Sequence, residues 1–320
     1  MTLLFIDPEF CNHRPPGRGD ETRHPECPQR IEAIEAALES ISGNGMQRLE
    51  TGQVASDSSL LRVHTGEHLG KIQDLSTAGG GWVDSDTYVG EASDRVARLA
   101  AGTACLLVDR VVAGAAINAM LIARPPGHHA TANTAMGFCI FNTIAVAAAH
   151  ALTHAGIDRV LIVDFDVHHG NGTQDIFYRS DQVGFLSMHR ENFYPHTGTA
   201  LETGAGAGVG YNVNVPIPAG TPIDEQMRRF DESLTALADH VRPNLVLTSA
   251  GFDAHHMDPV GNLAWHDEHF EHVAQRIATV AQQYAGGRWV SVLEGGYHPP
   301  SLAESVLGYL HIKQQSETGC

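Results

Sequence analysis

Residues 160–172 read VLIVDFDVHHGNG, and this segment decides the fold that we expect. A continuous run of apolar and β-branched residues is typical of a strand buried on both faces, as in parallel sheets. Open α/β folds bind their ligands at the carboxyl ends of such strands. Because alternate side chains of a strand share a face, we expect Asp164, Asp166 and His168 to point the same way. Carboxylates and an imidazole on one face suit a metal site, although a strand end with solvated polar residues would look the same.

Strands and helices are expected to alternate along the rest of the chain. Apolar runs predict further strands at 2–6, 118–123, 183–188, 245–249 and 289–293. Apolar stripes with helical period predict helices at 28–41, from about 56, and at 92–114, 142–155, 224–241 and 267–285. Neither a linker nor an internal repeat interrupts this pattern. We therefore expect one α/β domain over residues 1–320, with a mostly parallel central sheet covered by helices on both faces.

The composition argues against several classes of function. The formal net charge of −17 does not suit nucleic acid, whose phosphates need a basic surface, but it could favour cationic partners such as lysine-rich peptides or polyamines. No segment approaches the ~20 apolar residues of a membrane span, and MTLLFIDPEF at the start lacks the basic region of a signal peptide. Five cysteines without C-x-x-C spacing fit free thiols better than disulfides. We expect a soluble, cytoplasmic protein that contacts neither nucleic acid nor membrane; a homo-oligomer is compatible with the sequence.

Four expected strands lead into chemically active side chains. The residues that follow them are His128 and His129, then Asp164, Asp166 and His168, then Asp253, and finally Tyr297. In a parallel sheet these strand ends share one edge and can converge. Two carboxylates and one imidazole would leave a fourth coordination position open, as in a catalytic zinc site, although iron or cobalt could also bind. Each segment alone could be an ordinary capped turn in a chain with 20 histidines, so the site is indicated by the four together.

Five motifs resemble those of the zinc-dependent histone deacetylase family, in its class II and bacterial amidohydrolase branch, which includes acetylpolyamine amidohydrolases. They are RPPGHHA at 124–130, GFCIFN at 137–142, DFDVHHGNGTQ at 164–174, SAGFDAH at 249–255 and EGGYHP at 294–299. HPECPQRI at 24–31 and VDSDTY at 83–88 extend the resemblance over nearly the whole chain. The resemblance implies an arginase/deacetylase-like fold. It also implies that metal-activated water removes an acetyl or longer acyl group from the ε-amino group of lysine.

The resemblance implies a role for each residue of the site. Three residues match the ligands of one Zn²⁺ per chain: Asp166, His168 and Asp253. His128 and His129 match the tandem histidines, of which His129 would be the general base and then the general acid. Tyr297 matches the tyrosine that polarises the scissile carbonyl. Asp164 matches the carboxylate behind His128, and Asn171 matches the asparagine that class II members carry behind His129.

Residues around the substrate also follow from the resemblance. The residues that form the wall of the acyl tunnel in this family match Gly137, Phe138 and Tyr194. At the position of Tyr194, phenylalanine is more common in the family. Asp84 matches, less closely, the loop aspartate that holds the substrate backbone. The family also binds structural K⁺ or Na⁺. One such site matches Asp164, Asp166, His168, Ser187 and Met188, and a second matches Phe177, Ser180, Val183 and Tyr211.

Alternative substrates and functions remain open at this point. Val260 in DPVGN stands where polyamine-selective members place a glutamate, which favours an acyl-lysine peptide or protein over a small acylated amine. Glu191 or His196 could instead bind the distant amino group of a polyamine. An arginase-type ureohydrolase would need more carboxylates for two manganese ions than follow Asp253. A non-catalytic acyl-lysine binder would have lost the tyrosine or a metal ligand, whereas this chain fills each of those positions.

Overall fold

The computed structural model describes residues 1–15, 24–40, 46–261 and 263–316. Its main strands are β1 (Thr2–Ile6), β2 (Met46–Arg48), β5 (Asn118–Ile122), β6 (Val160–Asp164), β7 (Val183–Arg190), β8 (Asn212–Ile217), β9 (Leu245–Ala250) and β10 (Trp289–Leu293). They form one eight-stranded sheet in the order β2-β1-β5-β10-β9-β6-β7-β8. Every pair of neighbours in this sheet is parallel. Both the α/β class and the parallel sheet are confirmed.

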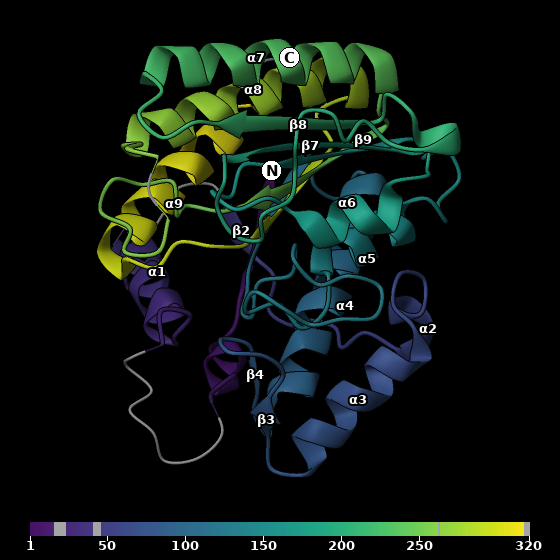
Figure 1. The fold of residues 1–320 in the computed structure, drawn as a ribbon, viewed down its shortest axis with the longest axis vertical. Helices are drawn as coiled ribbons and strands as arrows, with labels where there is room; N and C mark the ends of the chain where they lie inside the picture. Colours follow the sequence, from purple (N-terminus) through teal and green to yellow (C-terminus); the bar gives the residue numbers. More distant parts are fainter. Residues whose placement is uncertain (16–23, 41–45, 262, 317–320) are drawn as a thin grey trace.

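Helices cover the sheet on both faces. They are α1 (Gln29–Ser40), α2 (Asp57–Leu60), α3 (Gly66–Thr77), α4 (Ser93–Val112), α5 (Thr143–Ala151), α6 (Asn171–Phe177), α7 (Ile223–Val241), α8 (Asp267–Ala285) and α9 (Pro299–Gln315). Figure 1 shows α7 and α8 on one side of the strands and α4 and α5 on the other. Because the strands are covered on both faces, all five residues of β6 are buried, as its unbroken apolar run predicts.

The sequence-based prediction missed several elements. β8 contains Pro216 and is the last strand of the sheet, and an edge strand is the place where a sheet tolerates proline. β2 has only three residues, and the two-residue strands β3 (Gly81–Trp82) and β4 (Tyr88–Val89) form a separate hairpin. The helix α9 begins with Pro299 and Pro300, a start signal that was available in the sequence. The expected helix at 142–155 ends earlier, at Ala151.

A buried ion-pair cluster ties the N-terminal region to the sheet. Glu26 accepts hydrogen bonds from Arg124 Nε at 2.5 Å and Nη2 at 2.8 Å, and from Arg30 Nη1 at 3.2 Å. All three side chains are fully buried. Arg30 also donates to the carbonyl oxygen of Gly296 at 2.6 Å, so the cluster reaches the loop that follows β10.

The described residues include no helix that could span a membrane, and their four cysteines form no disulfide. In that part of the chain, no helix has the length and the apolar character needed to cross a bilayer. Cys11, Cys27, Cys105 and Cys139 are free thiols. Cys320 and residue 41, the last residue of the helix expected at 28–41, lie outside the described residues.

Candidate active site

The four strands that lead into the expected chemistry are neighbours in the sheet. The order β5-β10-β9-β6 sets their carboxyl ends side by side along one edge. The tandem histidines follow β5, Tyr297 follows β10, Asp253 follows β9, and the Asp166–His168 loop follows β6. The structure therefore brings together segments that lie far apart in the chain.

The loop after β6 is shaped by two successive hydrogen bonds from backbone to carboxylate. Asp164 Oδ1 accepts the N–H of Asp166 at 3.1 Å, and Asp166 Oδ1 accepts the N–H of His168 at 3.0 Å. Because β6 ends at Asp164, strand alternation does not orient Asp166 and His168. Aspartate side chains that bond their own backbone two residues on orient them instead. The side chains still gather at one place, since His128 contacts both Asp164 and Asp166 and His168 lies 2.9 Å from Asp166.

Asp166, His168 and Asp253 form a buried group of metal donors whose ligand atoms all lie within 4.8 Å of one another. His168 Nδ1 is 2.9 Å from Asp166 Oδ1 and 3.0 Å from Asp253 Oδ2. The opposite carboxylate oxygens are already occupied, because Asp166 Oδ2 accepts the N–H of Gly295 and Asp253 Oδ1 accepts the N–H of Val167, both at 2.8 Å. Asp253 Oδ2 is buried without a well-formed hydrogen bond. One oxygen of each carboxylate and one imidazole nitrogen therefore suit a zinc-like ion.

The charges in this group also favour a cation. Burial and the neighbouring charge of Asp166 raise the pKa of Asp253 to about 7. Burial also opposes ionisation of Asp166, but the charge of His128 and the hydrogen bond from His168 outweigh it and lower the pKa of Asp166. Two buried carboxylates at this separation repel each other unless a positive charge lies between them. A divalent ion would stabilise both.

His128 and His129 have neighbouring rings in opposite electrostatic environments. His128 Nδ1 lies 2.9 Å from Asp164 Oδ2, and although burial opposes protonation, the charge of Asp164 raises the pKa of His128 to about 10. His129 Nδ1 lies 2.8 Å from Asn171 Oδ1, to which it can donate. Burial and the charges of His128 and His168 lower the pKa of His129 well below its usual value. These surroundings favour a neutral His129, whose Nε2 could accept a proton, and a protonated His128.

Tyr297 lies at the same site with its hydroxyl protonated. Its ring is 5.6 Å from the ring of Phe138, and its backbone N–H donates to Asp258 Oδ2 at 2.6 Å. The guanidinium of Arg30 lies over the tyrosine ring, 5.0 Å from its centroid. Burial raises the pKa of Tyr297 well above its usual value. The hydroxyl can therefore donate a hydrogen bond at neutral pH.

The sequence-based prediction missed four supporting residues: Arg30, Phe193, Asp258 and Glu294. Glu294 Oε2 accepts the N–H of Gly127 at 2.6 Å and the N–H of His128 at 3.1 Å, and so fixes the turn that carries the tandem histidines. Phe193 stacks on His168, with ring centroids 5.2 Å apart. Each of the four lies in or beside a recognised motif, but the motif does not reveal which backbone groups or rings the side chain contacts.

The residues expected in the acyl-tunnel wall border the histidines and the tyrosine. Gly137 has a φ of +56°, and a Cβ there would lie 2.5 Å from His129 Cδ2 and 2.9 Å from Tyr194 Cε1. Only glycine fits such a position. The ring of Tyr194 stands edge to face against His129, 5.1 Å between centroids. Phe138 contacts Tyr297 instead, so a direct opposition of Phe138 and Tyr194 across a tunnel stays a prediction.

Asp84 and Val260 lie in loops that hydrogen bonds connect to the site. Asp84 is exposed and accepts the N–H of Thr87 at 2.6 Å, while Thr87 Oγ1 accepts the N–H of Phe138 at 3.1 Å. Val260 is half-buried, and its N–H donates to Asp258 Oδ1 at 2.9 Å. Contacts of Asp84 and Val260 with a substrate stay predictions.

Residues of the two expected monovalent-cation sites also lie close together. Asp164 and Ser187 are paired in the register of β6 and β7, beside the Asp166–His168 loop. In the second group, Ser180 donates its N–H to the carbonyl oxygen of Phe177 at 2.9 Å, and the carbonyl oxygen of Tyr211 accepts an N–H of β7 at 2.8 Å. Binding of K⁺ or Na⁺ at either position stays a prediction.

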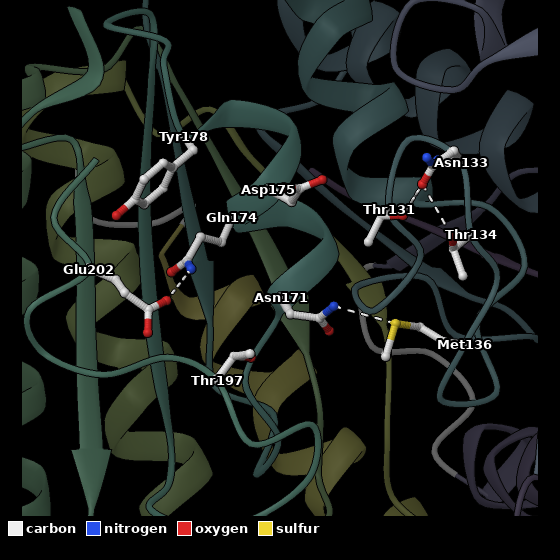
Figure 2. Close-up of a pocket in the computed structure, with 10 residues that line it drawn as sticks. All are labelled: Thr131, Asn133, Thr134, Met136, Asn171, Gln174, Asp175, Tyr178, Thr197 and Glu202. Carbon is white, nitrogen blue, oxygen red and sulfur yellow. Dashed lines mark hydrogen bonds between the residues drawn. The ribbon is translucent and has the colours of Figure 1, made fainter. Parts of the chain in front are cut away.

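A polar cavity of about 570 Å³ adjoins the site through Asn171. Figure 2 shows Asn171 in its wall, donating to Met136 Sδ at 3.5 Å, with Gln174 donating to Glu202 at 2.5 Å farther along. Neither the metal donors nor Tyr297 line this cavity. We therefore place the reacting group at the strand ends. The cavity lies next to Asn171, the residue that contacts His129.

Comparison with known proteins identifies the family of this fold and site. Residues 24–312 match the histone deacetylase domain. The histone deacetylase-like amidohydrolase of Pseudomonas aeruginosa is 39% identical over 89% of this chain and 74% of its own length. A probable deacetylase of Methanothermobacter thermautotrophicus is 41% identical over 90% of this chain and 85% of its own length.

A human relative and a solved structure agree with that match. The human polyamine deacetylase HDAC10 is 39% identical over 88% of this chain, which spans 44% of the human protein. The crystal structure of the HDA15 HD domain superposes with a TM-score of 0.90 at 34% identity, covering 98% of this chain and 90% of that domain. The parallel sheet, the converging strand ends and these similarities agree, and the chain belongs to the histone deacetylase family, whose members are hydrolases with an arginase/deacetylase fold.

Proposed function

We propose that the chain is a zinc-dependent amidohydrolase that removes acetyl or longer acyl groups from the ε-amino group of lysine in a peptide or protein. One observation carries this proposal. A neutral His129, a protonated Tyr297 and a three-donor metal group converge in one buried site. Asp166, His168 and Asp253 would hold one Zn²⁺, which when bound would supply Lewis-acid activation of water and of the scissile carbonyl.

The chain's own residues divide the proton chemistry between them. His129 can take a proton from the attacking water at Nε2, because its Nδ1–H is engaged by Asn171, and can return the proton to the leaving amine. His128 stays protonated against Asp164 and acts as a fixed positive charge beside the forming oxyanion. The hydroxyl of Tyr297 donates to that oxyanion, a contact that gains strength in the transition state.

The surroundings of the site support a linear acylated amine as the substrate. Because residue 137 has no side chain, the rings of His129 and Tyr194 can lie close against its backbone. Phe138 and Tyr194 add aromatic surface that suits the methylene groups of a lysine side chain. Val260 offers no carboxylate to pair with a second ammonium group, and this favours acyl-lysine.

Acetylpolyamine hydrolysis is the second candidate. The 39% identity to a human protein named polyamine deacetylase supports it. It shares every chemical step with the first candidate and differs only in what the mouth of the site recognises. Relative kcat/KM on the two substrate classes therefore separates the candidates.

The experiment that tests the proposed function combines turnover with metal removal. We expect the purified protein to hydrolyse an acetyl-lysine peptide, to lose activity on treatment with a chelator, and to recover it with Zn²⁺. His129→Ala should be inactive. His272→Ala is the matched control, because His272 is a surface histidine that pairs with Asp231 at 3.0 Å. Full activity after chelation, or in His129→Ala, would refute the proposed mechanism.

A further inference from the structure

A second group of metal-binding side chains lies on the helices α4 and α5. His150 is in the last turn of α5, and His154 follows four residues later, in the turn beyond that helix. Both rings reach one carboxylate on α4: Asp109 Oδ1 is 2.6 Å from His150 Nε2 and 2.8 Å from His154 Nε2. The ligand atoms of the three residues lie within 4.8 Å of one another.

The donor set and its spacing suit a divalent transition-metal ion. Two imidazole nitrogens and one carboxylate oxygen are ligands that Zn²⁺, Co²⁺ and Ni²⁺ share. A tetrahedral ion at 2.0–2.1 Å from each ligand would separate the ligand atoms by about 3.3 Å, so the two distances from Asp109 to the histidines would lengthen by about 0.5–0.7 Å. The side chains have room for this shift, because Asp109 is 42% exposed and His154 is 30% exposed. Water could fill the remaining position.

The electrostatic surroundings favour a cation at the same place. α4 ends at Val112 and α5 ends at Ala151, so the group lies near the C-terminal ends of two helices, where the helix dipole is negative. Within the described residues, Asp109 forms ion pairs with the two histidines and with no lysine or arginine. A metal ion would therefore meet a carboxylate that has no permanent positive partner.

The group is separate from the catalytic site. Asn142, which caps the N-terminus of α5, donates to the carbonyl oxygen of Ala130 at 3.0 Å and so lies at the catalytic edge of the sheet. His150 is eight residues farther along the helix, or about 12 Å at 1.5 Å per residue. None of the residues assigned to catalysis belongs to this group.

We propose that Asp109, His150 and His154 bind one divalent first-row transition-metal ion, in addition to the ion of the catalytic site. The affinity is expected to be moderate. His150 Nδ1 is buried and has no hydrogen-bond partner among the described residues. Metal-binding histidines are normally oriented by such a partner, whose loss typically lowers metal affinity about 10–100-fold.

Calorimetric titration of the zinc-loaded protein with ZnCl₂ tests the proposal, because the catalytic ligands are then already occupied. We expect about one further equivalent to bind. His154→Ala and Asp109→Asn should each weaken this binding at least about tenfold, or about 1.4 kcal/mol. Asp109→Asn preserves the side-chain shape, so it keeps the test valid if another variant folds poorly. Titration with Co²⁺, followed by visible absorption, gives a second readout that does not depend on turnover.

His272→Ala is the matched control, since it removes a surface histidine that pairs with the carboxylate of Asp231 and, among the described residues, has no second imidazole paired with that carboxylate. It should bind the further equivalent like the parent protein. Absence of a further equivalent would overturn the proposal. So would binding that persists in His154→Ala and Asp109→Asn, which would place the ion elsewhere, for example at His256 and His266, whose rings are 4.1 Å apart.

Discussion

Asp258 Oδ2 accepts the backbone N–H of Tyr297 at 2.6 Å, so a loop 39 residues earlier in the chain holds the backbone of Tyr297. The other oxygen, Oδ1, accepts the N–H groups of Val260 and Gly261, both at 2.9 Å. One carboxylate therefore connects the loop expected to contact the substrate with the tyrosine expected to polarise the scissile carbonyl. The buried side chain acts through Tyr297 as a positioning residue.

Asp258→Asn should lower kcat about tenfold, or about 1.4 kcal/mol, with a smaller effect on KM. An amide accepts hydrogen bonds at one end only, so either Tyr297 or the pair Val260 and Gly261 must lose its acceptor. Steady-state kinetics on an acetyl-lysine peptide measure the effect. Asp224→Asn, an exposed change on α7, is the control. Unchanged kcat in Asp258→Asn would show that the tyrosine is held by its ring contacts alone.

Asp253→Ala should abolish turnover and strongly reduce bound zinc. The substitution removes the one ligand oxygen that is buried without a well-formed hydrogen bond, and it leaves two ligands of the expected three. Elemental analysis of the purified variant gives the zinc content per chain. Asp175→Ala, at an exposed carboxylate that lines the polar cavity, should keep full metal content. Full zinc occupancy in Asp253→Ala would contradict the ligand assignment.

Tyr297→Phe should keep zinc and substrate affinity but lose about 10²–10³ in kcat, because the hydroxyl acts mainly in the transition state. The aromatic contacts with Phe138 and Arg30 do not need the hydroxyl, so the ring should stay in place. Kinetics together with the melting temperature of the variant separate the two effects. Near-normal turnover in the phenylalanine variant would mean that the metal alone polarises the carbonyl.

Glu26 predicts how the fold responds to acid. Although burial opposes its ionisation, Arg124, His13 and Arg30 lower the pKa of Glu26 from 4.5 to about 2. By linkage, ionised Glu26 adds about 3 kcal/mol to the free energy of unfolding. This stabilisation is present above pH 4.5 and is lost as the pH falls toward 2. Denaturant unfolding across this pH range measures the loss.

Glu26→Gln is the variant that isolates this carboxylate. It leaves two buried guanidinium groups without their anion and should destabilise the fold by about 3–5 kcal/mol at neutral pH. Its stability should also change less between pH 4.5 and 3 than that of the parent protein. Equal slopes in the two proteins would show that other groups cause the loss in acid. Burial lowers the pKa of His13 to about 3, so protonation of His13 in the unfolded state also destabilises the fold as the pH falls from 6.5 to 3. Because Glu26 lies 3.5 Å from His13 Nε2 and raises this pKa, the two proteins are compared above pH 3, where the folded state keeps His13 neutral in both.

Sequence patterns predict the parts of this molecule that depend on local periodicity or on a strand end. The apolar run of β6 indicates a strand buried on both faces. β6 pairs with β9, and β9 pairs with β10, which explains why three chemically active loops converge. β8 was missed because an edge strand of alternating polar and apolar residues that contains a proline lacks the usual apolar run. Asp258 and Glu294 were missed for another reason: they bind backbone N–H groups that only the folded chain brings near. Such contacts produce no periodic pattern of residues in the sequence.

Substrate preference is the last prediction, and it depends on Val260. A buried carboxylate that reads a distant ammonium discriminates by several orders of magnitude when the ammonium is missing, because the carboxylate is then left unpaired. Val260 is apolar and half-buried, and its backbone is held by Asp258, so the loop presents no such group at this position. We therefore expect higher kcat/KM on acyl-lysine peptides than on acetylspermidine or acetylputrescine.

Val260→Glu should shift the ratio of kcat/KM toward the polyamines, and Val260→Gln is its uncharged control. The glutamate adds a carboxylate where polyamine-selective relatives of this family are expected to carry one, whereas glutamine adds the same bulk without the charge. Parallel kinetics on one peptide and both polyamines measure the shift. If the unmodified protein prefers an acetylpolyamine tenfold or more, about 1.4 kcal/mol, then another group reads the second ammonium. The first candidates would be Glu191 and His196. Both are exposed, and they lie on either side of Tyr194 in the sequence.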